Sequence, residues 1–284
     1  MLVPFAGCFT ADPAAKLVFA GLADDSQSSF RHGAAHGPAS MRAAYDGDCY
    51  GSTSESGCDL AGKIFDAGDL SSLATWDATA KTFRDFAAAQ WRAGKIPFFA
   101  GGDHAVTVPV GEALAILGRP IHIIQLDAHP DLYPVYEGSA TSHACVAARL
   151  LEMPHVASVT QYGIRTENAV QADFARRHSG RLRQFHARSL SVSLEYPSHI
   201  PRGAPVYITL DLDGFDPAYA PGVSHPVPGG FTPRQVLNFL QFAPWSLAGM
   251  DVVELNPDAD IGHRTAVLAA RCLHESMAFA FASH

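Results

Sequence analysis

The sequence predicts an α/β protein with a three-layer α/β/α architecture, in which helices cover both faces of a central, mainly parallel sheet. Three observations support this prediction. Apolar β-rich runs alternate with helical patterns, the runs are apolar throughout, and each is followed by a polar cluster. Continuous apolar runs are typical of strands buried on both faces, and alternation with helices is typical of parallel sheets. We expect residues 1–284 to form a single domain.

The predicted strands are six short apolar runs. They read KLVFAGL, KIPFFAGGDH, IHIIQLDAH, VTQYGIRT, PVYITLDLD and LAGMDVVELNP, at residues 16–22, 95–104, 121–129, 159–166, 205–213 and 247–257. Helical patterns lie between them. One spans residues 76–94. Another begins after Thr232, a natural N-cap followed by Pro233 at the first helical position.

The composition excludes several classes of protein. Hydrophobic residues make up 48% of the chain and charged residues only 17%, which suits a large core and argues against disorder. A net charge of −8 makes nucleic acid and anionic membranes poor partners. The N-terminal segment lacks the basic residues of a signal peptide, and no stretch approaches the roughly 18 apolar residues of a membrane span.

The five cysteines are widely spread, odd in number and without zinc-finger spacing. We therefore expect reduced, buried thiols and a cytoplasmic protein. Cys49 and Cys58 lie close together in the sequence, and whether they interact stays open.

Charged residues gather where the predicted strands end. Asp103, His104, Asp127, Asp211 and Glu254 all lie at or just beyond the carboxyl end of a run. Ligands bind at that edge of an open parallel sheet. Because acidic groups that converge there would repel one another strongly, bound cations are expected.

Three of the candidate metal ligands lie in the segment DAHPDLY. Asp127, His129 and Asp131 are two residues apart, and Pro130 disfavours a helical conformation at His129. An extended chain would point all three side chains the same way. The segment is therefore predicted to leave its strand extended.

Three further candidate ligands end two other runs. Asp211 and Asp213 alternate in the same way, and His104 follows two glycines that allow close backbone approach. Singly, the two aspartates could be turn or capping acids and His104 a surface histidine. Together, two imidazoles and four carboxylates suit manganese-like ions better than structural zinc, and six ligands indicate two ions.

These motifs resemble the signatures of the arginase/agmatinase, or ureohydrolase, family. The matching segments are GGDHAVTVP, DAHPDLY, TLDLDGFDPAYAPGVSHPVPGG, MDVVELNP, SSFRHGAAHGPASMR and GDL. The resemblance extends from about residue 18 to residue 280. The segments EGSATSHACVAAR and PGVSHPVPGG are most similar to the plant-type arginase and agmatinase-like branch.

The resemblance implies a definite ligand arrangement and cofactor. One ion would be bound by His104, Asp127, Asp131 and Asp211, and the other by His129, Asp127, Asp211 and Asp213. It also implies two Mn²⁺ per chain, with nickel or cobalt as alternatives, and a homotrimer or homohexamer.

The family pattern also implies catalytic roles. Asp131 would accept a proton from a hydroxide shared by the two ions. Glu254 would pair with the substrate guanidinium, and His143 would protonate the leaving amine. Ala144 stands where many family members have glycine, and His225 is a competing candidate for the proton-transfer role.

The expected reaction is hydrolysis of a small cationic guanidino substrate to urea and an amine. Tyr133, Glu137, Ser139, Ser142 and Asn168 lie in loops that would surround the cleft. No basic residue in these segments is placed to bind a carboxylate, and Arg165 matches a largely structural family position.

Agmatine is therefore the first choice of substrate, followed by arginine and guanidino acids. The alternatives are an enzyme acting on a formimino-amino acid or an acylated amine, and a non-catalytic, metal-stabilised protein.

Overall fold

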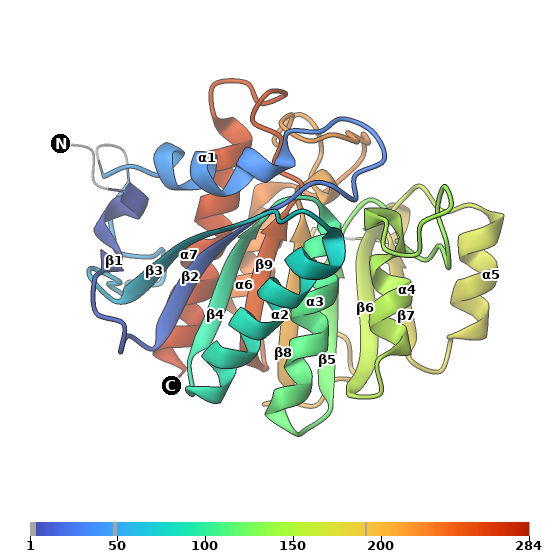
Figure 1. Cartoon of the computed structure of the whole chain (residues 1–284), viewed down its shortest axis with the longest axis horizontal. Coiled ribbons are helices and arrows are strands. Elements are labelled where there is room, and N and C mark those ends of the chain that lie inside the picture. Colours follow the sequence, from blue (N-terminus) through green and yellow to red (C-terminus); the bar gives the residue numbers. More distant parts are fainter. Residues whose placement is uncertain (1–3, 48–49, 191, 284) are drawn as a thin grey trace.

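A computed structural model describes residues 4–47, 50–190 and 192–283. Its central element is one sheet in the order β1-β3-β2-β4-β9-β8-β5-β6-β7, and every strand pair formed by the described residues is parallel (Figure 1). The strands are β1 (Phe9–Thr10), β2 (Leu17–Ala23), β3 (Ile64–Ser71), β4 (Ile96–Gly101), β5 (Ile121–Leu126), β6 (Val156–Ile164), β7 (Leu182–His186), β8 (Pro205–Asp211) and β9 (Ser246–Val253).

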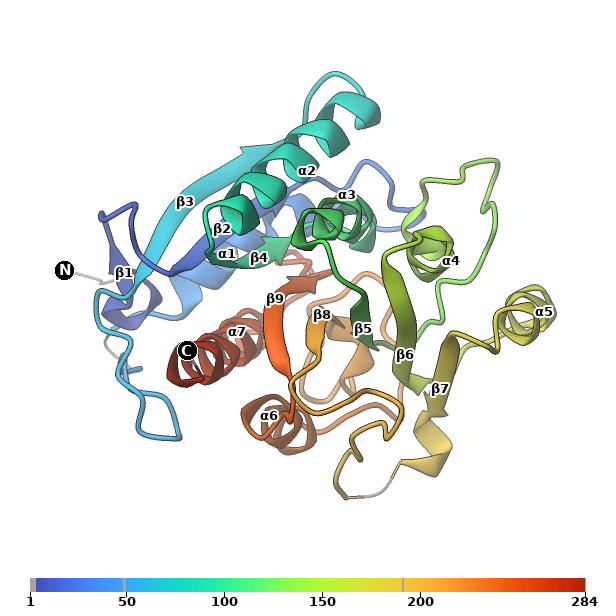
Figure 2. The ribbon, with the colours of Figure 1, turned by 90° about the horizontal axis from the view of Figure 1, so that it is seen from below.

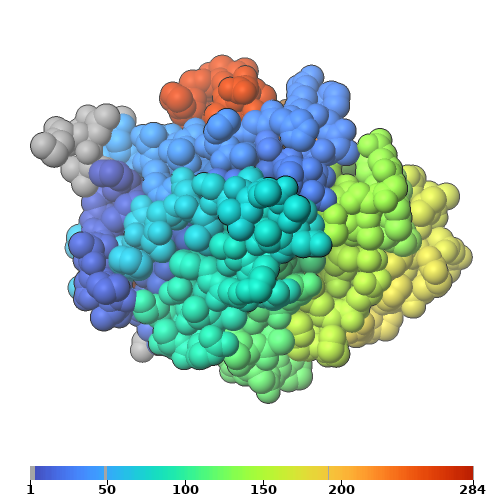
Figure 3. Space-filling model, in the orientation of Figure 1, coloured from blue at the N-terminus to red at the C-terminus, as the bar shows by residue number. Residues whose placement is uncertain are grey.

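Helices cover both faces of this sheet, which confirms the predicted α/β/α layers (Figure 2). They are α1 (Gly37–Ala44), α2 (Trp76–Arg92), α3 (Thr107–Ala113), α4 (Val146–Glu152), α5 (Ala169–Arg177), α6 (Pro233–Gln241) and α7 (Arg264–Ala282). Buried residues form one apolar cluster with α1, α6 and α7, and a second with α2, α3, α4 and α5. In Figure 3 the teal and green atoms of α2, α3 and α4 cover the face of the sheet on which the second cluster lies.

The local signals for two helices are confirmed. Helix α2 begins after Thr75, whose side chain accepts a hydrogen bond from the backbone of Ala78. Helix α6 begins after Thr232 with Pro233 in its first turn, and Thr232 and Gln235 form a reciprocal capping box. Each cap satisfies backbone N–H groups that the helix leaves free at its N-terminus.

All six predicted strands are present, and the described residues also form three strands that were not predicted. Strand β3 is mostly half-buried and carries Asp66 and Asp69, which bind Arg42. A strand with so many polar, partly exposed positions lacks the continuous apolar pattern on which the prediction depended. Strands β1 and β7 are short edge strands.

Two other expectations concern thiols and membranes. Cys8, Cys145 and Cys272 are buried free thiols. Cys49, the proposed neighbour of Cys58, lies outside the described residues. Among the residues that the structure describes, no helix is long and apolar enough to cross a membrane.

Candidate metal centre

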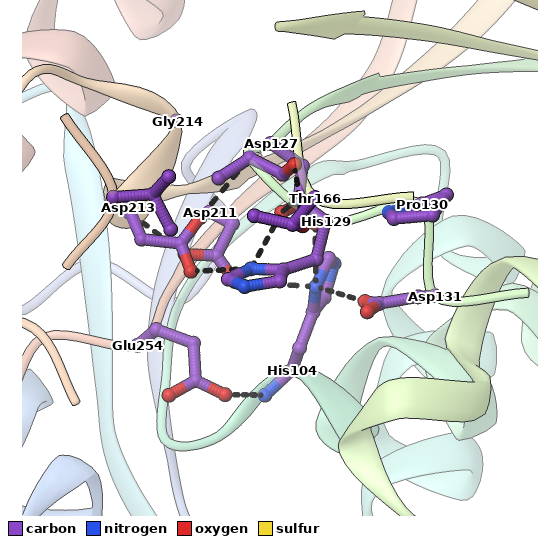
Figure 4. A network of polar contacts seen from close by, with 12 residues as sticks. His104, Asp127, His129, Pro130, Asp131, Thr166, Asp211, Asp213, Gly214 and Glu254 are labelled. Carbon is purple, nitrogen blue, oxygen red and sulfur yellow. Dashed lines mark hydrogen bonds and ion pairs between the residues drawn. The ribbon is translucent and has the colours of Figure 1, made fainter. Parts of the chain in front are cut away.

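All six predicted ligands meet at the carboxyl ends of three strands. His104 follows β4, the segment Asp127–Asp131 follows β5, and Asp211 and Asp213 lie at the end of β8. Figure 4 shows their side chains converging on a common space. The parallel order β4-β9-β8-β5 places these strand ends at one edge of the sheet.

The first ligand group surrounds His104. Its Nδ1 atom lies 3.2 Å from Oδ2 of Asp127, 3.0 Å from Oδ2 of Asp131 and 3.4 Å from Oδ2 of Asp211. Although this nitrogen is buried among three carboxylate oxygens, it makes no hydrogen bond of regular geometry within the part of the chain that the structure describes. Atoms placed in this way around one point suit a shared cation better than a hydrogen bond.

The second ligand group contains His129. Its Nδ1 atom lies 2.8 Å from Oδ2 of Asp213 and 3.7 Å from Oδ1 of Asp127. Asp127 is therefore common to both groups, with one oxygen near each histidine. Its own Oδ1 atom also accepts a hydrogen bond of 2.6 Å from the backbone of His129.

The predicted extended path of residues 127–131 is wrong in its detail. The chain bends at Ala128 and His129, and Asp131 has a φ of 48°. This left-handed conformation, rather than strand alternation, brings Asp131 to His104. A non-glycine residue in this region is strained by about 1–3 kcal/mol, and such strain is often found at functional sites. Glu254, with a φ of 66°, is strained in the same way.

Burial, reinforced by mutual repulsion, disfavours the charged form of two of the aspartates. Burial and the charge of Asp127 raise the pKa of Asp131 to about 6. Burial, with the charges of Asp213 and Asp127, raises the pKa of Asp211 well above its usual value. Burial opposes the charged form of His129, but Asp213 and Asp127 outweigh it and raise its pKa to about 12. The site therefore stabilises positive charge strongly.

Hydroxyl groups fix the orientation of the His104 ring. Nε2 of His104 lies 2.9 Å from Oγ1 of Thr209, and Thr209 is in turn hydrogen-bonded to the buried carboxylate of Asp251. Asp251 also accepts hydrogen bonds of 2.8 Å from Tyr207 and 3.0 Å from Thr107. A ring that donates from Nε2 presents the lone pair of Nδ1 to the carboxylate cluster, as a metal ligand must.

The two remaining catalytic candidates contact each other. Nδ1 of His143 lies 2.9 Å from Oε1 of Glu254, which also accepts a hydrogen bond of 2.9 Å from the backbone of His104. Oε2 of Glu254 is buried and has no hydrogen-bond partner among the described residues. On the other side of the His143 ring, Nε2 lies 2.9 Å from Oγ of Ser29 and 3.3 Å from the backbone nitrogen of the same residue.

A cavity of about 180 Å³ opens onto these groups. Of the five loop residues that we expected around it, only Tyr133 lines it. Glu137, Ser139, Ser142 and Asn168 do not, and the last two cap η5 (His143–Cys145) and α5. The cavity is lined by Ser29, His104, His129, Asp131, Tyr133, Tyr136, His143, Ala144, Thr166, Gln171, Asp211, Asp213, His225 and Glu254.

Sequence reasoning missed four residues of this lining: Ser29, Tyr136, Thr166 and Gln171. Ser29 lies in the SSFRHG segment, which carried a weak signal through the family resemblance. Tyr136, Thr166 and Gln171 belong to no motif that distinguishes them from ordinary loop and helix residues.

His225 lies beside the candidate proton donor. Its ring centroid is 5.3 Å from that of His143 and 6.0 Å from that of His129. The ring of Phe30 also packs against that of His225, with the centroids 5.3 Å apart. Burial and the charge of His143 lower the pKa of His225, so its neutral form is favoured beside those two rings. It is a cavity residue as well as a loop residue.

Arg165 is structural, as the resemblance implied. Its guanidinium donates to the backbone carbonyls of Gly163, Asp213, Gly214, Phe215 and Val227 at 2.6–3.3 Å. These bonds hold the loop that carries Asp213. With its donors occupied in this way, Arg165 does not line the cavity.

Comparison with known proteins shows one family. The model of the arginase family matches residues 15–278. Arginase 1 of Arabidopsis thaliana, a mitochondrial protein, is 39% identical over 184 residues, which are 63% of this chain and 53% of the plant protein. The chain thus spans about half the length of the plant relatives that it matches first.

Solved structures match over more of their length. Agmatine ureohydrolase of Thermoplasma volcanium is 29% identical, with a TM-score of 0.86 and coverage of 100% of this chain and 97% of that one. Arginase of Medicago truncatula is 31% identical, with a TM-score of 0.81 and coverage of 94% and 88%.

Proposed function

The chain belongs to the arginase family, and from that premise we propose that it hydrolyses a small cationic guanidino compound to urea and an amine. One observation carries this proposal. Two histidine–aspartate groups share Asp127, and the buried carboxylate of Glu254 lies in the same cavity. A guanidinium is a poor electrophile, so its hydrolysis needs both an activated nucleophile and a fixed anionic partner.

We propose two manganese ions as the cofactors. The donors of both groups are imidazole nitrogens and carboxylate oxygens, which suit manganese better than structural zinc. The unpaired Nδ1 atom of His104 supports the fit, because a bound cation would satisfy it. When bound, the two ions would supply hydroxide near neutral pH by lowering the pKa of a shared water molecule.

The chain's own carboxylates would orient the reactants. Oε1 of Glu254 is held by His104 and His143, while Oε2 stays available for a guanidinium N–H. Such a charge-assisted hydrogen bond is stronger than a neutral one in a buried site. Asp131 contacts His104 at the centre of the first group and would accept the remaining proton of the attacking hydroxide.

His143 would protonate the leaving amine. Burial lowers the pKa of His143, but the charge and hydrogen bond of Glu254 outweigh it and raise the pKa to about 9. The imidazole is therefore protonated at neutral pH and can act as a general acid. His225 has a lowered pKa and is a weaker proton donor.

We propose agmatine as the first substrate to test. The described residues that line the cavity include no lysine or arginine, so a substrate carboxylate would have no cationic partner there. Tyr133, Tyr136, Thr166 and Gln171 offer only neutral polar groups. A neutral hydrocarbon stem with an amine at its far end suits this lining and the net charge of −8.

Urea release from the manganese-loaded chain tests the proposal. Agmatine, arginine and 4-guanidinobutanoate are compared at equal concentrations, with nickel and cobalt as alternative metals. We expect urea from agmatine at the highest kcat/KM. Absence of urea from all three substrates with every metal would overturn the proposed function, and a preference for arginine would overturn only the substrate.

We also propose that the chain assembles as a homotrimer or homohexamer in the cytosol. Family membership supports this assembly, and light scattering of the purified chain measures it.

A further inference from the structure

Three glutamines lie side by side on neighbouring strands behind the candidate metal centre. Gln125 of β5 is in register with Gln161 of β6, and Gln161 is in register with Gln184 of β7. Gln125 and Gln161 are fully buried, and Gln184 is half-buried. We call this row the glutamine ladder.

Hydrogen bonds connect the ladder to a ligand of the metal centre. Nε2 of Gln184 donates to Oε1 of Gln161 at 3.0 Å, and Nε2 of Gln161 donates to Oε1 of Gln125 at 2.8 Å. Nε2 of Gln125 then donates to Oδ2 of Asp127 at 2.7 Å. Nε2 of Gln161 also donates to the carbonyl of Pro130 at 2.6 Å.

The direction of donation along this row is fixed by its ends. A deprotonated carboxylate and the Pro130 carbonyl can only accept, so an amide nitrogen must face each of them. Gln125 therefore presents its nitrogen to Asp127 and its oxygen to Gln161. Gln161 in turn presents its oxygen to Gln184. All donors point toward the metal centre, and each bond polarises the next.

The glutamine ladder lies on a sheet face that is otherwise apolar, where burying an amide costs free energy. Ile123 and Val159 precede Gln125 and Gln161 by two residues and therefore lie on the same face of the sheet. Both belong to the apolar cluster under α2, α3 and α4. In an ordinary core strand, the next residue on this face would also be apolar. Two buried amides are stable there because the nitrogen and the oxygen of each have a hydrogen-bond partner.

The ladder acts on the one carboxylate that both ligand groups share. Oδ2 of Asp127 faces His104 and accepts from Gln125, while Oδ1 faces His129 and accepts from the backbone of that residue. With a donor on each oxygen, the plane of the carboxylate cannot rotate freely. The contact between Gln161 and Pro130 restrains the loop to Asp131 as well.

We infer that Gln125 is a positioning residue for metal binding, and that Gln161 and Gln184 hold it in place. This inference rests on the proposed two-metal function. Loss of such outer partners usually lowers metal affinity about 10- to 100-fold. Gln125→Leu should therefore weaken Mn²⁺ binding by a factor in that range, and Gln161→Leu by a similar or smaller factor.

The test measures Mn²⁺ dissociation constants and stoichiometry on the full chain by calorimetry, without substrate, together with thermal unfolding. Thr160→Val is the matched control. Thr160 is buried next to Gln161 and its hydroxyl lies 3.1 Å from Nε2 of His199; no hydrogen bond between described residues joins Thr160 to the metal centre. We expect the control to lose stability but to bind Mn²⁺ as the wild type does.

The outcomes separate this inference from the proposed function. Wild-type affinity in Gln125→Leu, with two ions still bound, would overturn the positioning role alone. Failure of the wild type to bind two ions would overturn the proposed function and this inference together. If Gln125→Leu does not fold, Gln184→Leu at the half-buried end of the ladder decides: weaker Mn²⁺ binding than in Thr160→Val supports the inference, and equal binding overturns it.

Discussion

Nδ1 of His143 lies 2.9 Å from Oε1 of Glu254, and both side chains are buried beside the cavity. Their charges therefore stabilise each other with little screening by solvent. The pair holds a proton donor and an anionic substrate partner side by side. Two roles in the proposed reaction thus depend on one contact.

Replacing Glu254 with glutamine should damage both roles. We expect kcat/KM for the best guanidino substrate to fall by about 100-fold or more, because one partner of a buried charge pair is lost. Without Glu254, burial would dominate and lower the pKa of His143. Steady-state urea release and NMR titration measure the two effects. Glu152→Gln, on the exposed side of α4, is the control, and an active Glu254→Gln enzyme would disprove the role.

Asp211→Asn should make the metal-free chain more stable. Burial and neighbouring charges raise the pKa of Asp211 well above 3.8. The carboxyl group of Asp211 thus ionises more easily in the unfolded chain than in the folded one. Stability therefore falls once the pH exceeds the pKa in the unfolded chain, and this loss is complete above the pKa in the folded chain. At neutral pH and without metal, we expect a higher Tm for Asp211→Asn than for the wild type.

Added Mn²⁺ should reverse that order. A ligand that binds only the folded state stabilises it by about 2.7 kcal/mol at 100 times its Kd. We expect Mn²⁺ to raise the Tm of the wild type strongly and that of Asp211→Asn weakly. The exposed Asp12→Asn variant should follow the wild type. Equal metal-induced shifts in Asp211→Asn and the wild type would contradict the assignment of Asp211 as a ligand.

Arg165→Lys should destabilise the fold by about 2–3 kcal/mol, because a lysine cannot satisfy the same set of buried carbonyls. The loop with Asp213 would lose most of its support. Urea denaturation of the metal-free protein measures the change in free energy of unfolding. Arg176→Lys is the control, since the Arg176 side chain is 72% exposed. Equal stability of the two variants would argue against this role.

Protonation of His274, a residue outside the metal centre, should make the stability of the fold depend on pH. It is fully buried, with Nδ1 2.9 Å from the hydroxyl of Tyr45 and Nε2 3.0 Å from the carbonyl of Ser52. Burial lowers the pKa of His274 below 6.5. The unfolded chain therefore takes up this proton first, so stability is present above pH 6.5 and is lost as the pH falls toward the folded pKa.

Thermal unfolding between pH 8 and pH 5 tests this assignment on the metal-free chain. We expect the Tm of the wild type to fall more steeply with decreasing pH than that of His274→Gln. His32→Gln, at a side chain that is 62% exposed, should keep the wild-type slope. Parallel curves for the wild type and His274→Gln would show that another group is responsible.

The sequence by itself determined the layers and the place of the site. Continuous apolar runs predicted every strand that is buried on both faces. Polar residues at the ends of those runs predicted the edge of the sheet at which the candidate metal centre lies. These signals are local, because burial on two faces and the end of a strand can each be recognised from a few neighbouring residues. Strand β3, with its half-exposed aspartates, lacks the continuous apolar run that would have predicted it.

Only the tertiary structure decided which groups contact which. The contact between Ser29 and His143 joins residues 114 positions apart, and Gln161 reaches Gln125 only because β5 and β6 pair in one register. The left-handed turn at Asp131 also depends on its surroundings, since the local sequence indicated an extended chain. Contacts of this kind follow from how distant segments pack, which no pattern of neighbouring residues records.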